Sequence, residues 1–592
     1  MNDYWKGRGS PWEYDSGPPK NKDWAKLFAA TPNYRRLGVE KVAGATEQFR
    51  WHFGPMFYRG RLTSNSVKVL VIGQEGGQDE SLSHRAFTGG TGARLQRFVR
   101  YLGIEESYLF LNTFIYSIVG QYVPPLKWLA QDPSSPVVQH RHNIFNYVLS
   151  QNDVRLVIAV GQAAKESVVT WIESRGGSCP DGPKDLTTAQ ADKLGAHTKA
   201  IGVMHPGMAS KGGSAGAVSK DFKKAIGKIK QWIAADATWL TADPSGSRDF
   251  TKDYSYGSDP VPFRDFPYGM SWRLGRDGTS SNRKDQQRSI QLFSEAGAYN
   301  AAGVTLVYQD ECEGTQEGYA DNPGDLAYEP PKINFSDFDA GPGSDFARLF
   351  MGGMPGLAWP DFKALGVTSD PSFGWGQIHR GRPDDATVYI LADQQSNDDI
   401  FTGRTLTGES GQRLQRFLSS MGILTKYIVI RTLPVDTMDL PPAKIGSISL
   451  NPQVLKIHQA ILDRVIAQSP ALKLALSFGT AAGSVMTKLS LHDTPAVQLK
   501  SWTSPGSLND WQQKLQDIKL IPYPKEAVNP SFQYDGARGQ IPRIDLPFGV
   551  PRWVGTSGNR GSRPNIKPGN KLSPDYYKIY MPLWAFKLKP PP

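Results

Sequence analysis

Three polar residues in the first half of the 592-residue chain each follow a short apolar run. They are Glu75, within the segment Gly-Gln-Glu-Gly-Gly at 73–77, Asn112 and His205. A carboxylate, an amide and an imidazole that meet at one place can hydrogen-bond the edge of a polar planar ligand and stabilise charge that develops on it. These residue types make the three positions candidates for an active site.

The surrounding pattern explains how these residues could meet. Apolar runs typical of strands covered on both faces lie at 67–72, 108–111, 156–160 and 200–204. Amphipathic segments such as 92–102 separate them. Alternating strands and helices predict an α/β fold with a mostly parallel sheet, whose ligands bind beyond the carboxyl ends of the strands. The three candidate residues lie at those ends.

The chain also contains an internal repeat. Residues 85–113 align without gaps with residues 404–432, and 13 of the 29 aligned positions are identical. Runs farther along keep an offset of 318 or 319, as far as 203–206 against 521–524. The repeat predicts two tandem copies of one α/β domain.

The second copy is expected to be degenerate. The offset aligns Gln74 with Asp393, Glu75 with Gln394, Asn112 with Arg431 and His205 with Tyr523. Scaffold glycines and the run Arg-Leu-Gln-Arg-Phe are kept, whereas the amide, the carboxylate and the histidine change. Asp398, aligned with Asp79, keeps an acid at its position. We therefore expect the second copy to brace the first or to bind DNA.

Charge is unevenly distributed along the chain. Lys and Arg number 67 against 56 Asp and Glu, a net charge of +11, to which residues 1–250 contribute +9, residues 301–350 contribute −8 and residues 351–592 contribute +9. Basic residues alternate with aromatic ones after residue 551, a pattern suited to phosphates and stacked bases.

Cysteine content and hydropathy exclude several classes of protein. Two cysteines are too few for a disulfide framework, a four-cysteine zinc site or an iron–sulfur cluster, and we expect neither a metal nor a cofactor. No apolar run is long enough for a signal-peptide core or a membrane span. We therefore expect a cytoplasmic protein that makes no contact with membranes.

The order of the motifs resembles that of the uracil-DNA glycosylase superfamily. Its members begin with a glycine motif such as GQDPY, continue through F-x-G-x-x-G, use an asparagine after an apolar strand and end on a loop of the H-P-S type. The counterparts here are GQEGG at 73–77, Phe87 to Gly92, LFLNT at 109–113 and HPGMAS at 205–210. The resemblance covers residues 50–235 well and residues 370–530 weakly. It implies two three-layer α/β/α domains, each with a central parallel sheet.

The domain organisation that follows has five parts. They are an N-terminal extension (1–50), a catalytic domain (51–240), a linker or insert (241–350, acidic at 301–350), a degenerate domain (351–545) and a basic aromatic tail (546–592).

The resemblance implies how the first copy would hold a base. Phe87 would stack on a base flipped out of DNA, while Asn112 and Gln74 would bind the base's polar edge. His205 would stabilise the negative charge that grows on the base as the glycosidic bond breaks. No lysine lies in these motifs to form a Schiff base, so water is the expected nucleophile.

A carboxylate would hold that water and face the positive charge that develops on the sugar. Glu75 is favoured for this role, Asp79 comes second, and Glu80 is a further candidate. Met208 would wedge into the duplex where the base has left. The residues expected to contact DNA are Arg85, Arg94, Met208, Ser210 and Lys211.

These roles imply a monofunctional DNA glycosylase that acts on double-stranded DNA and leaves an abasic site. The second copy, the insert and the basic tail resemble the layout of a bacterial anti-phage branch of the superfamily. That layout implies excision of a modified cytosine, α-glucosyl-hydroxymethylcytosine, from phage DNA, and hence antiviral defence. GQEGG and HPGM depart from the standard motifs, which leaves two alternatives open: a uracil-DNA glycosylase of base-excision repair, and a non-catalytic reader of modified DNA.

Overall fold

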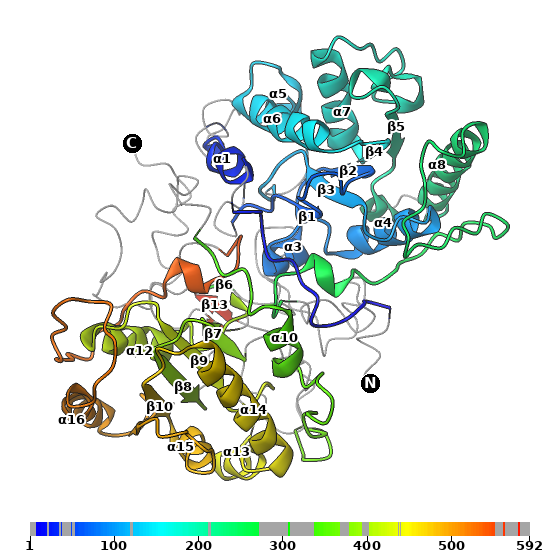
Figure 1. Cartoon of the computed structure of the whole chain (residues 1–592). Coiled ribbons are helices and arrows are strands. Elements are labelled where there is room, and N and C mark those ends of the chain that lie inside the picture. Colours follow the sequence, from blue (N-terminus) through cyan, green and yellow to red (C-terminus); the bar gives the residue numbers. More distant parts are fainter. Residues whose placement is uncertain are drawn as a thin grey trace.

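The structure of the protein is a computed structural model in which two sheet-centred halves lie side by side (Figure 1). It describes residues 7–20, 23–34, 37, 49, 54–118, 122, 124–210, 215–270, 306–307, 337–367, 378–393, 399, 402–435, 437, 440–550, 561–562 and 578–580. We call the described residues 7–270 the first half and 337–550 the second half.

The first half is built on a sheet of five strands. Their order is β1 (Arg59–Gly60), β3 (Tyr108–Asn112), β2 (Val69–Gly73), β4 (Leu156–Val160) and β5 (Lys199–Val203). β1 pairs antiparallel with β3, and all other pairings are parallel. The α/β fold with a mostly parallel sheet is therefore confirmed, with one antiparallel edge strand that the sequence pattern did not indicate.

Alternate residues of the strands face two layers of helices. Val69 and Val71 belong to the core with α4 (Gly90–Tyr101) and α8 (Ala215–Ala235), whereas Leu70 and Ile72 belong to the core with α6 (Pro136–Gln151) and α7 (Gln162–Ser174). Buried strands of this kind read as continuous apolar runs because both faces are covered. The remaining helices of this half are α1 (Trp24–Ala29), α3 (Gln78–Ser83), α5 (Lys127–Gln131), η3 (Pro124–Leu126), η4 (Leu186–Thr188), η5 (Ala191–Lys193), η6 (Pro206–Ser210) and η7 (Phe263–Asp265).

The second half contains a second five-stranded sheet with the same order and pairing directions. In corresponding order its strands are β7 (His379–Gly381), β9 (Tyr427–Arg431), β8 (Val388–Ala392), β10 (Leu474–Phe478) and β11 (Ala496–Leu499). Tyr427 pairs with Val388 as Tyr108 pairs with Val69, so the register follows the sequence offset of 319. The helices of this half are α10 (Ser344–Phe350), α12 (Glu409–Ser420), α13 (Pro442–Ser449), α14 (Pro452–Gln468), α15 (Thr480–Met486), α16 (Ser507–Lys519) and η10 (Arg543–Asp545).

A small third sheet joins two distant parts of the chain. Its strands are β12 (Gly561–Ser562), β13 (Lys578–Tyr580) and β6 (Leu306–Val307). Most of the acidic segment 301–350 and most of the basic aromatic tail lie outside the described residues. No helix within the described ranges is both long and apolar enough to cross a membrane.

Residues 241–270, expected to begin a linker, lie inside the fold of the first half. The Asp243 carboxylate accepts hydrogen bonds from the backbone N–H groups of Glu105, Glu106 and Ser107, which precede β3. Glu526 holds the three corresponding N–H groups of the second half, at residues 424–426. Each half is thus closed by a segment that follows its last long helix.

Gly92 of the F-x-G-x-x-G motif is required by close approach to Phe87. A Cβ atom at Gly92 would lie 1.6 Å from the Phe87 carbonyl oxygen, and a Cβ at Gly411 would lie 1.6 Å from that of Leu406. Both contacts are with backbone, so neither can be relieved by rotation of a side chain. The helix that begins at Gly90 can pack on its turn only if residue 92 has no side chain.

We expect Gly92→Ala to lower the free energy of unfolding by about 1–3 kcal/mol, because an inserted methyl forces the turn and the helix apart. The control is Gly227→Ala in α8, where an added Cβ meets nothing within 4 Å. That substitution should instead stabilise the helix by about 0.5–1 kcal/mol. Urea unfolding followed by circular dichroism checks both; equal stability of Gly92→Ala and the parent chain would contradict the packing argument.

Candidate active site

Two candidate residues converge on Gly73, the last residue of β2. Gly73 is the strand partner of Asn112 at the end of β3. A Cβ atom at Gly73 would lie 2.3 Å from Cζ of Phe87 and 2.6 Å from Oδ1 of Asn112. The aromatic ring and the amide therefore meet over a residue that must lack a side chain.

The Asn112 amide is buried and unsatisfied. The residue is 4% exposed, and neither Oδ1 nor Nδ2 has a hydrogen-bond partner among the described residues. Most buried polar groups in proteins are hydrogen-bonded, and a buried amide without a partner carries a free-energy penalty. An amide held in this state can both donate to and accept from the edge of a planar ligand.

Phe87 is held in a strained backbone conformation. Its φ of 55° lies in the left-handed region, which costs roughly 1–2 kcal/mol for a residue with a Cβ. The ring is 6% exposed and lies 5.1 Å from the Phe110 ring between centroids, tilted by 50°. Leu406, the aligned residue of the second half, has a φ of 52°. The turn conformation is therefore common to both halves, but the aromatic ring is present only in the first.

The buried carboxylate of Glu80 fixes this turn to the glycine loop at 73–77. Oε1 accepts the backbone N–H groups of Thr88 and Gly89, each at 2.8 Å, and Oε2 accepts that of Gly77 at 2.8 Å. Burial, followed by the neighbouring charge of Asp79, raises the pKa of Glu80. Because both oxygens hold backbone, Glu80 is suited to positioning the two loops rather than to holding water.

The glycine loop itself is held by the strand that carries Asn112. The Gly73 carbonyl accepts hydrogen bonds from the Thr113 N–H at 2.8 Å and from the Thr113 hydroxyl at 2.9 Å, and the Gln74 carbonyl accepts one from the Phe114 N–H at 2.9 Å. Glu75 follows directly and is half-buried, as is Gln74. Asp79, the second acidic candidate, is buried in α3.

His205 lies two residues beyond the end of β5, and β4 separates this strand from β2, which carries Gly73. Its Nδ1 accepts a hydrogen bond from the backbone N–H of Gly207 at 3.1 Å. A neutral ring therefore carries its proton on Nε2, which makes that nitrogen a hydrogen-bond donor. A Cβ at Gly161, the residue after β4, would lie 3.1 Å from the Cβ of His205, so the imidazole packs over a strand end that has no side chain.

The residues expected to contact DNA differ in their placement. Met208 is 49% exposed in the short helix η6 after His205, and Ser210 ends that helix. Arg94 is part-buried and donates to the Gly90 carbonyl, whereas Lys211 lies outside the described residues.

The structure contradicts the expectation that Arg85 contacts DNA. Its guanidinium is buried, pairs with Asp15 at 2.5 Å and donates to the carbonyls of His84 and Phe548, each at 2.9 Å. A side chain held in this way is unavailable to a DNA phosphate, so Arg85 belongs to the interior of the protein.

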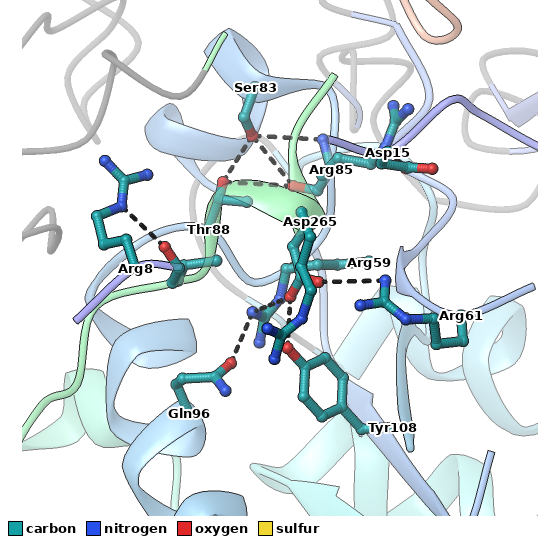
Figure 2. Close-up of polar contacts among 12 residues, drawn as sticks. Arg8, Asp15, Arg59, Arg61, Ser83, Arg85, Thr88, Gln96, Tyr108 and Asp265 are labelled. Carbon is teal, nitrogen blue, oxygen red and sulfur yellow. Dashed lines mark hydrogen bonds and ion pairs between the residues drawn. The ribbon is translucent and has the colours of Figure 1, made fainter. Parts of the chain in front are cut away.

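Figure 2 shows Arg85 and Asp15 beside a second buried pair, Arg59 and Asp265, which are joined at 2.9 Å. The Tyr108 hydroxyl also donates to Asp265, at 2.8 Å. Asp15, Arg59 and Asp265 were not among the residues singled out from the sequence.

Two short repeats could have revealed the two aspartates. Tyr-Asp-x-Gly-Pro at 14–18 matches Phe-Asp-x-Gly-Pro at 338–342, an offset of 324. Pro-x-x-Asp-x-Pro-Tyr-Gly at 262–269 matches Pro-x-x-Asp-x-Pro-Phe-Gly at 542–549, an offset of 280. Each repeat contains one of the buried aspartates, in both halves.

The corresponding strand ends of the second half are occupied by structural contacts. Asp393 accepts the Ala481 N–H at 2.8 Å in the first turn of α15, and burial raises the pKa of Asp393. Arg431 is buried and donates to the Val435 carbonyl. Gln394 and Asp398 lie outside the described residues.

The expected alignment of His205 with Tyr523 is wrong: Leu499 of β11 pairs with Phe478 as Val203 of β5 pairs with Val160, so Ser501 takes the place of His205. Tyr523 follows α16, and its hydroxyl donates to the Met421 carbonyl at 2.9 Å.

Comparison with known proteins gives a family match for the first half. A comparison with curated proteins gives no match. Residues 61–230 match the model of the Uracil DNA glycosylase superfamily, and this range includes every candidate catalytic and base-binding residue from Gln74 to His205. Residues 61–230 of this chain therefore form a domain of the uracil-DNA glycosylase superfamily.

Proposed function

We propose that the protein is a DNA glycosylase that flips a non-canonical base out of double-stranded DNA and hydrolyses its N-glycosidic bond, leaving an abasic site. The observation that carries this proposal is the unsatisfied, buried Asn112 amide beside the Phe87 ring at Gly73. A hydrogen-bonding edge beside an aromatic face is what a flipped base requires.

In the proposed reaction, the base stacks on Phe87 and hydrogen-bonds to Asn112, with Gln74 as a further contact. As the glycosidic bond breaks, negative charge grows on the base, and the Nε2–H of His205 donates a hydrogen bond to it. The Gly207 N–H supports this role because it holds Nδ1 as an acceptor and keeps the proton of a neutral ring on Nε2. A donor fixed before the reaction stabilises the transition state without reorganisation.

Water is the proposed nucleophile, and Glu75 is favoured to hold it, with Asp79 second. Glu80 is the least suited of the three acids because its oxygens already accept three backbone hydrogen bonds. The carboxylate would also face the positive charge that develops on the sugar ring.

The proposed DNA surface begins at the loop that follows His205. Met208, the exposed apolar residue of that loop, would fill the space left by the base. Ser210, Lys211 and Arg94 would contact the backbone. Exposed lysines of α8, namely Lys220, Lys223 and Lys224, extend a basic face from the same loop.

For the base itself we propose α-glucosyl-hydroxymethylcytosine of phage DNA, which makes the protein an antiviral enzyme. The support is the layout: a second half with the same sheet topology, proposed to be a degenerate tandem copy, and a basic aromatic tail. Uracil excision and non-catalytic reading of modified DNA are the alternatives.

His205→Ala and Asn112→Ala should each lower the single-turnover rate of base excision by about 10²–10³, the usual effect of removing one preorganised donor to a developing charge. Ser501→Ala is the matched control, because Ser501 lies two residues beyond the end of β11, as His205 lies two residues beyond the end of β5. Its excision rate should stay at that of the parent chain. A full rate in His205→Ala would refute the assigned role.

A panel of duplexes separates the three substrates. Oligonucleotides containing uracil, unmodified cytosine or α-glucosyl-hydroxymethylcytosine are incubated with the protein, and abasic sites are then cleaved with alkali. We expect strand cleavage with the glucosylated duplex alone. Cleavage of only the uracil duplex would favour the repair enzyme, and tight binding to glucosylated DNA without cleavage would favour the reader.

A further inference from the structure

The turn that carries Phe87 is held from outside the superfamily domain. Arg85, two residues before Phe87, binds Asp15 from the N-terminal segment and the Phe548 carbonyl from the end of the second half. Asp15 also accepts the Tyr58 hydroxyl at 2.8 Å, and the Tyr58 carbonyl accepts the Ala86 N–H at 3.0 Å. We call Asp15, Arg85 and the Phe548 carbonyl the clamp.

The second half contributes more than one hydrogen bond to this clamp. The Phe548 ring is buried in the hydrophobic core of the first half, 5.6 Å from Phe28 and 5.9 Å from Phe57 between ring centroids. A Cβ at the adjacent Gly549 would lie 2.8 Å from the Cβ of His84. The segment 548–549 therefore packs directly against the residues that lead into the turn.

The arrangement is reciprocal. In the second half, Arg404 pairs with Asp339 at 2.5 Å and donates to the carbonyl of Tyr268, which belongs to the first half. The Tyr268 side chain is buried in the core of the second half. Each half thus closes the turn of the other with a Pro-aromatic-Gly segment.

The clamp matters for the candidate site because the turn that it holds contains Phe87. A left-handed φ in a bulky residue persists only where the surroundings leave the chain no alternative. Glu80 and a hydrogen bond between the Ser83 and Thr88 hydroxyls hold the turn from within the domain, whereas the clamp holds it from outside. Loss of the clamp would remove the outside restraint on the residues that lead into Phe87 while leaving the bonds of Glu80 and Ser83 intact.

We propose that the clamp is a positioning device, through which Asp15 and the second half set the ring of Phe87 against Gly73. In this arrangement the second half acts on the first active site without touching the substrate. The kinetic part of the proposal rests on the proposed glycosylase function, whereas the structural part does not.

The test compares Asp15→Asn with Asp339→Asn in the full chain. The two carboxylates are matched: each is 11% exposed, binds an arginine Nε and accepts a glycine N–H. In hydrogen–deuterium exchange, Asp15→Asn should speed exchange at 83–92 about tenfold and leave 402–411 unchanged. Asp339→Asn should do the reverse. Equal exchange at both turns in both variants would overturn the clamp, whether or not the protein excises bases.

Kinetics test the positioning role. Asp15→Asn should slow single-turnover excision ten- to a hundredfold without changing the Kd for abasic-site DNA, while Asp339→Asn stays within twofold of the parent at a temperature where all three are folded. Gly549→Ala, which introduces a side chain at a φ of 98° against His84, should act like Asp15→Asn. An equal loss of rate in Asp15→Asn and Asp339→Asn, or a loosened turn with an unchanged rate, would overturn the proposal. Absence of excision by the parent chain would refute the proposed function, and the exchange result would still stand by itself.

Discussion

In each half, a buried arginine–aspartate pair joins an edge strand of the sheet to the closing segment. Arg59 and Asp265 are both inaccessible to solvent, and they join the edge strand β1 to a segment that follows the last long helix. Arg380 and Asp545 repeat this pair in the second half at 2.9 Å. Removing one partner of such a pair leaves a charge in the interior and costs about 3–5 kcal/mol. The edge strands, the closing segments and the contacts between the halves all depend on these charges being matched.

The candidate active site is built on this frame at a local cost in stability. The Asn112 amide is buried without a partner among the described residues, and Phe87 has a left-handed backbone. Departures from local rules of this kind concentrate at functional sites and need compensation elsewhere. Here the compensation comes from groups that hold backbone, above all Glu80, and from the ion pair of Arg85. Asp399, aligned with Glu80, accepts the Thr407 N–H in the second half, so both halves hold this turn with a buried acid.

The sequence predicted what has a local pattern. Strands β2, β3, β4 and β5 were expected from continuous apolar runs, because both faces of their sheet are covered. β1 has only two residues, and the Arg59–Asp265 bond spans 206 positions, so neither leaves a periodic signal. The segments that contain Asp15 and Asp265 repeat at offsets of 324 and 280 rather than 319, so a search at one offset does not find them. Arg85 was expected at the surface because a sequence does not distinguish a buried cation from an exposed one.

The bond between Arg85 and Phe548 links residues 463 positions apart. A chain emerging from the ribosome therefore contains all the candidate catalytic side chains long before the residue that closes their turn has been synthesised. Domains generally fold from the N-terminus during synthesis, and contacts of high sequence separation form late. The turn around Phe87 can reach its final form only after residue 548 has been synthesised, so the order of translation itself delays maturation of the site until both halves exist.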